Sequence, residues 1–271
     1  GREESQKLHL NPNSGRWNPD ASARAHHIGV AVAYNVWQYY QVTGDLEYLI
    51  ENGAEMLAEI ARFWVSRAEF DEAKRRYVIR GVIGPDEFHS GYPDRPYDGV
   101  DNNAYTNVMA VWAIVRALDA LDALPLRDRL DLLERLGIHG GELDRWDDVS
   151  RRMYVPFHAA PGTGPKAGRG VISQFEGYAD LEELDWHGLR ERHGNIQRLD
   201  RILEADNDSV NRYKASKQAD VLMLFYLLSA DELRELFARM GYRFTPEQIP
   251  KTVDYYLHRT SHGSTLSGVV H

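Results

Sequence analysis

Apolar residues recur every three or four positions along most of the chain, the spacing that places them on one face of an α-helix. Ser22 is expected to cap the first helix, which stops at Thr43 and Gly44. Asp45 is expected to cap the second helix, and Gly137 ends a short amphipathic one. The pattern predicts helices over residues 22–42, 46–64, 103–121, 126–136, 213–228, 231–240 and 245–258.

Other segments interrupt this helical pattern. Residues 75–83 have the composition of a strand and are expected to form a hairpin or an extended segment. Residues 84–101 form a polar loop, 161–170 form a Gly/Pro-rich loop, and 150–200 as a whole follow no clear period. No tandem repeat is visible. Helix after helix, with the unusual sequences in the connections, predicts an all-α domain with its loops gathered at one end.

The ends of the chain carry their own expectations. Residues 266–271 begin an apolar helical pattern that stops after one turn, which is shorter than a helix needs. We therefore expect a fragment of a larger protein or a trimmed chain. The first residues hold no apolar stretch of the signal-peptide kind. No run approaches the roughly 20 apolar residues that span a bilayer.

Composition narrows the class of protein. The 271 residues, 43% of them hydrophobic, suffice for one large domain or two modest ones. A net charge of −9 argues against a nucleic-acid or anionic-membrane partner. The absence of cysteine excludes thiolate metal sites and fits a reducing compartment, so we expect a cytoplasmic protein. Six Trp and fifteen Tyr suit a carbohydrate site, although most such rings belong to cores.

The segment at 81–107 concentrates polar side chains that could bracket a polyhydroxylated ligand. A carboxyl group beside aromatic rings can lose its water, which suits it to general-acid work. The alternatives are a solvated acidic loop or a calcium loop, but the alternating ligand spacing of calcium loops is missing. The residues concerned are Asp86, Glu87, His89, Asp94, Asp98, Asp101, Asn102, Asn103 and Asn107.

Two further segments carry candidate chemistry. Residues 259–267 cluster hydroxyls, a glycine and a histidine before a new helix, which suits an anion site or simple helix capping. His258 and His262 are spaced i, i+4, but no HExxH motif accompanies them and we expect no metal. Lys217 and Gln218 are polar residues on a predicted helix that otherwise enters the core, or else lie in its exposed first turn.

Four separated motifs, in order, resemble glycoside hydrolase family 65. They are GPDEFH at 84–89, DNNAYTN at 101–107, KQAD at 217–220 and SHGSTLS at 261–267. The opening GREESQKLHLNPNSGRWNPD and the HHIGVAVAYNVWQYYQVTGD that follows also match the family. The family contains phosphorylases of maltose, kojibiose, nigerose, trehalose and trehalose 6-phosphate, with some hydrolases.

This resemblance implies an (α/α)6 barrel, of which residues 1–271 would be one part. The family's N-terminal β-sandwich, first barrel helices and C-terminal β-domain have no counterpart here. The resemblance makes Glu87 the general acid and places the donor glucosyl unit on Lys217 and Gln218. Asp86, His89 and Asn103 are expected to add contacts to substrate. Phosphate would bind His262, Gly263, Ser264 and Ser267, and Thr265 replaces a serine of the family pattern.

The implied reaction is inverting phosphorolysis of an α-linked glucose disaccharide. Inorganic phosphate is then the co-substrate, and no cofactor is expected. Residues 259–267 contain no carboxylate, which suits an anion better than the base that a hydrolase needs. The alternatives are a trehalase-like inverting hydrolase with Glu176 as base, and an inactive sugar-binding fragment. A homodimer is also compatible with the family.

The linkage and the acceptor sugar are left open by the sequence. Five side chains could contact an acceptor sugar, or could simply be ordinary surface groups. These candidates are Arg95, Tyr97, Arg151, Arg152 and Lys166.

Overall fold

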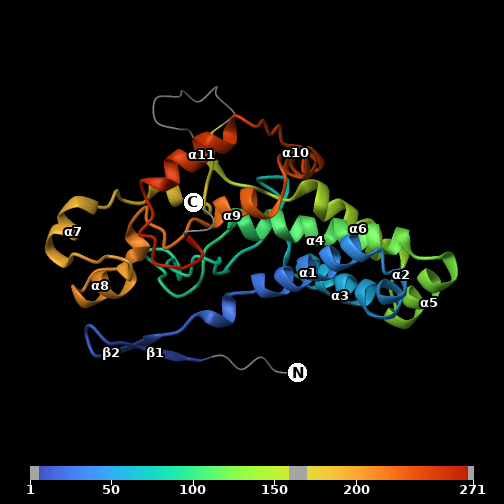
Figure 1. The fold of residues 1–271 in the computed structure, drawn as a ribbon, viewed down its shortest axis with the longest axis horizontal. Coiled ribbons are helices and arrows are strands. Elements are labelled where there is room, and N and C mark those ends of the chain that lie inside the picture. Colours follow the sequence, from blue (N-terminus) through green and yellow to red (C-terminus); the bar gives the residue numbers. More distant parts are fainter. Residues whose placement is uncertain (1–5, 159–169, 268–271) are drawn as a thin grey trace.

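The structure, a computed structural model, describes residues 6–158 and 170–267 and is mainly helical (Figure 1). The helices are α1 His27–Thr43, α2 Leu46–Tyr48, α3 Ala54–Arg67, α4 Ala104–Ala123, α5 Leu126–Leu136, α6 Gly140–Arg152, α7 Trp186–His193, α8 Leu199–Ala205, α9 Asp220–Leu227, α10 Ala230–Arg239 and α11 Gln248–Leu257. A π-helical turn at Leu49–Gly53 joins α2 to α3.

Three antiparallel hairpins accompany the helices. They pair β1 Leu8–Asn11 with β2 Arg16–Pro19, β3 Glu69–Asp71 with β4 Arg76–Val78, and β5 Phe157–His158 with β6 Val171–Ile172. The strand-like character predicted for residues 75–83 is confirmed by β4, but the hairpin is made with β3, which precedes this range. Among the described residues, none of the helices combines the length and the hydropathy that a membrane span requires.

The helix α4 is the centre of the larger core. It contacts α1, α3, α6, α9 and α10, and its residues from Ala104 to Ile114 are all buried. A helix that is apolar on every side must lie inside a bundle. Asn103 begins it by accepting a hydrogen bond from the Thr106 backbone N–H at 2.9 Å. This start lies beside the polar loop, so one end of the core helix fixes the position of that loop.

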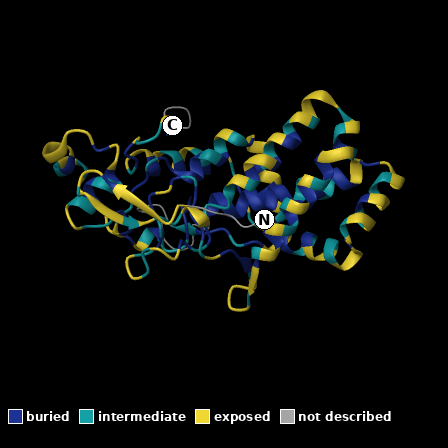
Figure 2. Cartoon of the chain, turned by 90° about the horizontal axis from the view of Figure 1, so that it is seen from below, coloured by how far each residue is buried: buried dark blue, intermediate teal, exposed yellow. Residues whose placement is uncertain are grey.

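A second, smaller core lies at the other end of the molecule. It joins α7, α8 and the segment before α9, and it includes Phe88 from the polar loop. Figure 1 shows α7, α8 and the β1–β2 hairpin at one end and α1 to α6 at the other. Figure 2 shows buried residues concentrated where the helices face one another. The polar loop therefore connects two cores, since Val82 and Val100 pack in the larger one and Phe88 in the smaller.

Several predicted helix boundaries are confirmed, and one cap is wrong. The first helix ends at Gly44 with φ 65°, and Asp45 caps the next by accepting from the Tyr48 backbone N–H. Helix α5 has the predicted bounds and ends at Gly137. Ser22 does not cap α1: it lies in a separate 3-10 turn, Ser22–Arg24, and α1 begins at His27 without a side-chain cap.

The helix predicted at 213–228 is wrong over its first half, because α9 begins only at Asp220. The backbone N–H of Ser216 donates to the Arg259 carbonyl, and that of Lys217 donates to the Asp86 carboxylate. These long-range partners hold residues 213–219 out of helical conformation. Helices α6, α7 and α8 were missed. The predicted loop at 161–170 and the end of the pattern at 266–271 lie largely outside the described residues.

Candidate active site

The candidate site begins at a tight turn at Gly84–Glu87. The Glu87 backbone N–H donates to the Gly84 carbonyl at 3.1 Å, and Pro85 occupies the second position of the turn. Glu87 itself has φ 63°, a left-handed conformation that non-glycine residues adopt rarely and that clusters at functional sites. Its side chain is 62% exposed. The desolvated carboxyl group of this turn is therefore Asp86 and not Glu87.

Glu87 meets Lys217 across the site. The Lys217 ammonium lies 3.0 Å from a Glu87 carboxylate oxygen, and the lysine side chain is 21% exposed. The two residues are 130 positions apart, in two of the motifs found in the sequence. The structure thus brings together the predicted acid and one predicted sugar contact. Gln218, the next residue, is buried, and its carbonyl oxygen has no partner among the described residues.

Asp86 is buried and accepts two backbone hydrogen bonds from the lysine segment. Its Oδ1 atom receives the N–H of Lys217 at 2.5 Å and that of Gln218 at 3.1 Å. The Asp86 N–H in turn donates to Asp220 Oδ1 at 2.6 Å. Asp220 Oδ2 receives the side-chain amide of Asn103 at 2.8 Å. Asp86, Asn103 and Asp220 therefore form a buried layer beneath the exposed pair.

Burial sets the protonation of this layer. Desolvation raises the pKa of Asp220 to about 7, against the hydrogen bonds from Asn103 and Asp86 that lower it. Desolvation and the neighbouring Asp220 carboxylate raise the pKa of Asp86. Desolvation lowers the pKa of His89 to about 4, so its buried ring is neutral at pH 7. Its Nε2 atom lies 3.0 Å from the Tyr213 carbonyl, which fits a donated hydrogen bond.

The predicted phosphate loop packs directly on the lysine segment. The Ser261 N–H donates to the Ser216 carbonyl at 2.8 Å, and the Gly263 N–H donates to the Lys217 carbonyl at 3.2 Å. A Cβ atom on Gly263 would lie 2.1 Å from the Gln197 carbonyl oxygen, so this close approach requires glycine. The loop that we predicted for phosphate therefore adjoins the residue that contacts Glu87.

Within this loop, His262 has φ 54° and its Nδ1 atom lies 2.7 Å from the Ser267 hydroxyl. Ser267 is buried, whereas His262 is exposed. The Ser264 hydroxyl accepts a hydrogen bond from the Leu266 N–H at 3.2 Å. The loop is thus a compact turn that presents a histidine at its surface.

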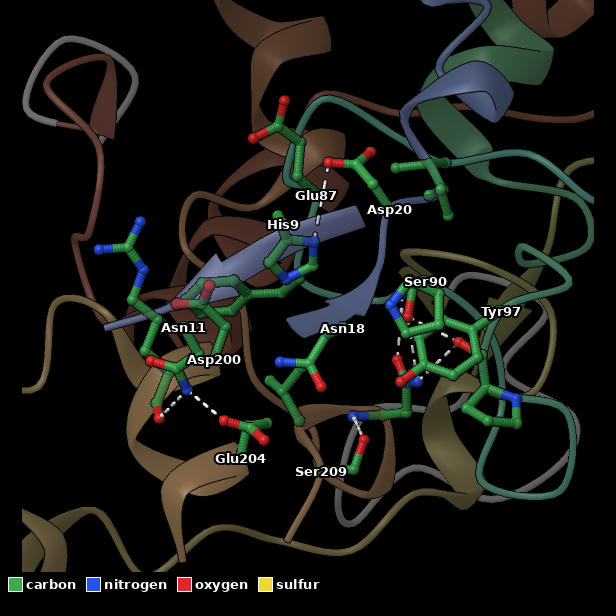
Figure 3. A pocket seen from close by; sticks show the side chains of 18 of the residues that line it. His9, Asn11, Asn18, Asp20, Glu87, Ser90, Tyr97, Asp200, Glu204 and Ser209 are labelled. Carbon is green, nitrogen blue, oxygen red and sulfur yellow. Dashed lines mark hydrogen bonds and ion pairs between the residues drawn. The ribbon is translucent and has the colours of Figure 1, made fainter. Parts of the chain in front are cut away.

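A cleft of about 390 Å³ opens beside Glu87 and Lys217, within the size range of small-molecule sites. Figure 3 draws Glu87 and Asp20 at one side of this pocket, with Asn11, Asp200 and Glu204 across from them. The walls come from the β1–β2 hairpin, the polar loop, α8 and residues 208–211. The lining residues with ionisable side chains are His9, Asp20, Glu87, Arg198, Asp200, Arg201, Glu204, Asp208 and Lys217.

The sequence analysis missed most of this cleft, because the hairpin and α8 carried no recognised chemistry. It also missed His27, whose Nδ1 atom lies 3.3 Å from the Ile83 carbonyl. Burial lowers the pKa of His27, and the nearby negative charge of Glu87 opposes that effect. The only available signal was the HH pair at the start of α1.

Other candidates are engaged elsewhere. Glu176 accepts from the Asn102 side chain at 2.6 Å and pairs with Lys74 at 3.0 Å. Arg95 pairs with Asp101 at 2.6 Å. Among the described acceptor candidates, Tyr97 alone lines the cleft. Arg151 and Arg152 pair with acids on their own helix. Lys166 lies outside the described residues.

The described residues do not gather a metal site. Helix α11 ends at Leu257, so His258 and His262 do not share a helical turn. No group of three His, Cys, Asp or Glu side chains that could hold an ion occurs among the described residues.

The chain was compared with known proteins. The model of the glycosyl hydrolase family 65 central catalytic domain matches residues 1–271. An uncharacterized glycosyl hydrolase of Mycobacterium tuberculosis is 69% identical over 100% of this chain and 20% of its own length. Trehalose 6-phosphate phosphorylase of Lactococcus lactis is 35% identical over 98% of this chain and 32% of its own. These matches confirm the resemblance carried by the four motifs.

A solved structure supports the same fold. A putative kojibiose phosphorylase from the human microbiome superposes with a TM-score of 0.68 and 26% identity, over 90% of this chain and 31% of that one. The chain therefore spans between a fifth and a third of the length of these relatives.

Proposed function

The chain belongs to glycoside hydrolase family 65, and on that premise we propose that the natural protein splits an α-linked glucoside by inverting phosphorolysis. The relatives named trehalose 6-phosphate phosphorylase and kojibiose phosphorylase support this reaction class. We further propose that residues 1–271 are part of one (α/α)6-barrel catalytic domain. The observation that carries the proposal is the exposed Glu87, held in a rare backbone conformation against Lys217 at the edge of a cleft.

In the proposed reaction the Glu87 carboxyl group donates its proton to the glycosidic oxygen. An oxygen of inorganic phosphate attacks the anomeric carbon from the opposite face, and the bond from that carbon to the glycosidic oxygen breaks. The products are β-glucose 1-phosphate and a sugar with a restored hydroxyl group. One carboxyl group suffices, because phosphate is already a nucleophilic anion and needs no base.

Lys217 and Gln218 are proposed to contact the glucosyl unit that is transferred. The Lys217 ammonium has three N–H donors, so it can donate to sugar hydroxyls while it stays beside Glu87. Asp86, His89 and Asn103 were predicted to touch substrate as well. Their burial supports instead a role behind the contact surface.

His262, Gly263, Ser264 and Ser267 are proposed to form the phosphate site. The backbone contact between Gly263 and Lys217 supports a place for phosphate next to the transferred sugar. The cleft lined by the β1–β2 hairpin and α8 is proposed to receive the sugar that is released. No cofactor is required for this chemistry.

The test uses the full natural protein with a panel of α-linked glucose disaccharides and trehalose 6-phosphate, with and without inorganic phosphate. β-Glucose 1-phosphate and free glucose are assayed separately. We expect sugar phosphate only when phosphate is present. Glu87→Gln should lower this activity by about 10²- to 10⁴-fold, the usual contribution of a general acid, while Glu191→Gln on the exposed face of α7 should not.

Three results would contradict the proposal. Release of free sugars without phosphate would make the protein a hydrolase and would remove the role of the loop at 261–267. Sugar binding without turnover by the full natural protein would leave a binding protein. A fully active Glu87→Gln variant would exclude Glu87 as the acid, whatever the reaction.

A further inference from the structure

The turn that carries Glu87 and the segment that carries Lys217 are joined by reciprocal bonds between carboxylates and backbone amides. The Asp86 carboxylate binds the amides of Lys217 and Gln218, at 2.5 Å and 3.1 Å. The Asp220 carboxylate binds the amide of Asp86 at 2.6 Å. Each segment thus supplies both a carboxylate and an amide to the other. Each of these bonds lies within a few residues of the exposed pair.

The two acids at this contact are closed to solvent, and the turn approaches them closely. Asp86 is 3% exposed and Asp220 is 1% exposed. A Cβ atom on Gly84 would lie 1.9 Å from Asp220 Oδ2, so the turn can approach this closely only because it begins with glycine. Breaking one of these buried hydrogen bonds leaves its partner unsatisfied.

Asn103 ties this contact to the core. Its side-chain oxygen caps α4, accepting from the backbone N–H and the hydroxyl of Thr106, both at 2.9 Å. Because the oxygen is used in this way, the amide nitrogen must face Asp220, to which it donates at 2.8 Å. The orientation of Asn103 is therefore fixed by the start of the central helix, and Asp220 must present an acceptor to it.

We propose that Asp86 and Asp220 are positioning residues that hold the general acid Glu87 against Lys217. This rests on the proposed function for the role of Glu87. The two acids are buried, and they act through the backbone of the residues that we propose to contact substrate. Misplacing a catalytic group by about 1 Å can lower a rate about a hundredfold, so loss of this contact should reduce kcat more than it raises KM.

The test exchanges the two polar groups. Asp220→Asn turns one acceptor of Asp220 into a donor, which then faces the donor of Asn103. The double variant Asn103→Asp and Asp220→Asn reverses the bond, keeps one carboxylate in the site, and retains a good cap for α4. We expect Asp220→Asn to lower kcat by about tenfold or more with KM changed less than about threefold, and the double variant to recover most of the loss.

A second readout is independent of the reaction. Hydrogen exchange followed by mass spectrometry should show faster exchange of the peptides that contain residues 84–90 and 214–220 in Asp220→Asn. The double variant should restore slow exchange. Asp148→Asn on α6, which also removes a hydrogen-bonded carboxylate, is the matched control and should alter neither kcat nor exchange in these peptides. Should Asp220→Asn fail to fold, Asn103→Ser keeps a cap and removes only the donor to Asp220.

Each outcome decides a separate claim. Unchanged exchange and kcat within about twofold of the wild type in Asp220→Asn would overturn the positioning role. So would a folded double variant that recovers slow exchange but no activity. If the wild type itself makes no sugar phosphate, the proposed function fails, and unchanged exchange in Asp220→Asn would then overturn the contact as well.

Discussion

At the scale of single residues, the candidate site depends on glycine as much as on its charged groups. Gly84 begins the turn that carries Glu87, and any side chain there would meet Asp220 Oδ2 at 1.9 Å and Asn103 Nδ2 at 2.5 Å. Both atoms belong to groups that are already hydrogen-bonded to each other, so neither can move aside without losing a buried bond. The constraint is steric, because this glycine has no left-handed backbone angle.

We therefore expect Gly84→Ala to lower the free energy of unfolding by about 1–3 kcal/mol, the usual cost of overpacking a buried site. It should also reduce activity, because the displaced turn carries Glu87. Gly29 in α1 is the matched control, since a Cβ atom there meets nothing within 4 Å. Gly29→Ala should leave stability unchanged or raise it by up to about 1 kcal/mol. Urea unfolding measures both, and equal stabilities of the two variants would contradict the steric argument.

The sequence predicted Glu87 and Lys217 as site residues, and the structure places them in contact, but the sequence could not predict their buried support. Asp86 finds its partner Asp220 at a separation of 134 residues, and a single sequence carries no signal for such a pairing. The burial of Asp86 and the exposure of Glu87 follow from the direction of one turn. Neighbouring carboxylates in the same motif therefore have opposite environments that residue type alone does not distinguish.

At the scale of elements, the β1–β2 hairpin is held to α8 mainly by one carboxylate. Glu204 accepts hydrogen bonds from the side chains of Asn11, Ser14 and Arg16, three of the residues at the hairpin's turn. The hairpin buries little apolar surface, since Leu8, Leu10 and Trp17 are all exposed. Its position over the cleft thus depends on polar contacts.

Glu204→Ala should release the hairpin and raise KM for the disaccharide about threefold or more, with a smaller change in kcat, since the loss falls on binding. Limited proteolysis should cut residues 8–19 faster in this variant. Glu191→Ala on α7 is the control, because Glu191 is exposed and pairs with His187 on the same helix. Unchanged KM together with faster cleavage would mean that the hairpin does not bind the released sugar.

Helices were predicted correctly where local sequence signals stabilise them, and wrongly where distant contacts decide the conformation. Helix α5 was predicted with its bounds because its amphipathic pattern and the glycine after it are local. The extended segment before α9 was predicted as helix because its apolar residues continue those of the helix. Its backbone bonds to Asp86 and Arg259 come from distant parts of the chain and override the local preference. Helices α7 and α8 are short and polar, and they are fixed by the smaller core.

At the scale of the whole molecule, two cores of unequal size meet at the candidate site. Phe88 packs in the smaller core, while Val82 and Val100 at the ends of the same loop pack in the larger one. Glu87 is therefore held between the cores, and we expect the buried carboxylates beneath it to meet solvent only when the fold opens. The free energy of unfolding of the protein should therefore depend on the protonation of these buried groups.

Two buried groups of the site, Asp220 and His89, change the free energy of unfolding in opposite directions as pH changes. The pKa of Asp220 rises from an ordinary value of 3.8 to about 7, so between these values the folded state binds a proton that the unfolded state has lost. The contribution of Asp220 to the free energy of unfolding therefore falls as pH rises from about 4 through 7. The pKa of His89 drops from 6.5 to about 4, and its contribution falls instead as pH decreases through that range. Two further charges act on the buried acids: Lys217 lowers the pKa of Asp86, and Glu87 raises the pKa of Asp220.

Replacing Asp220 separates the two trends. Urea unfolding of the wild type and of Asp220→Asn at pH 5, 6, 7 and 8 gives the difference in their free energies of unfolding at each pH. The variant loses a hydrogen bond at every pH, but it no longer releases a proton on unfolding. We expect the advantage of the wild type to be largest at pH 5 and to shrink steadily toward pH 8. A difference that is constant with pH would mean that Asp220 is ionised throughout the range, and that its hydrogen bonds from Asn103 and Asp86 outweigh the cost of burial.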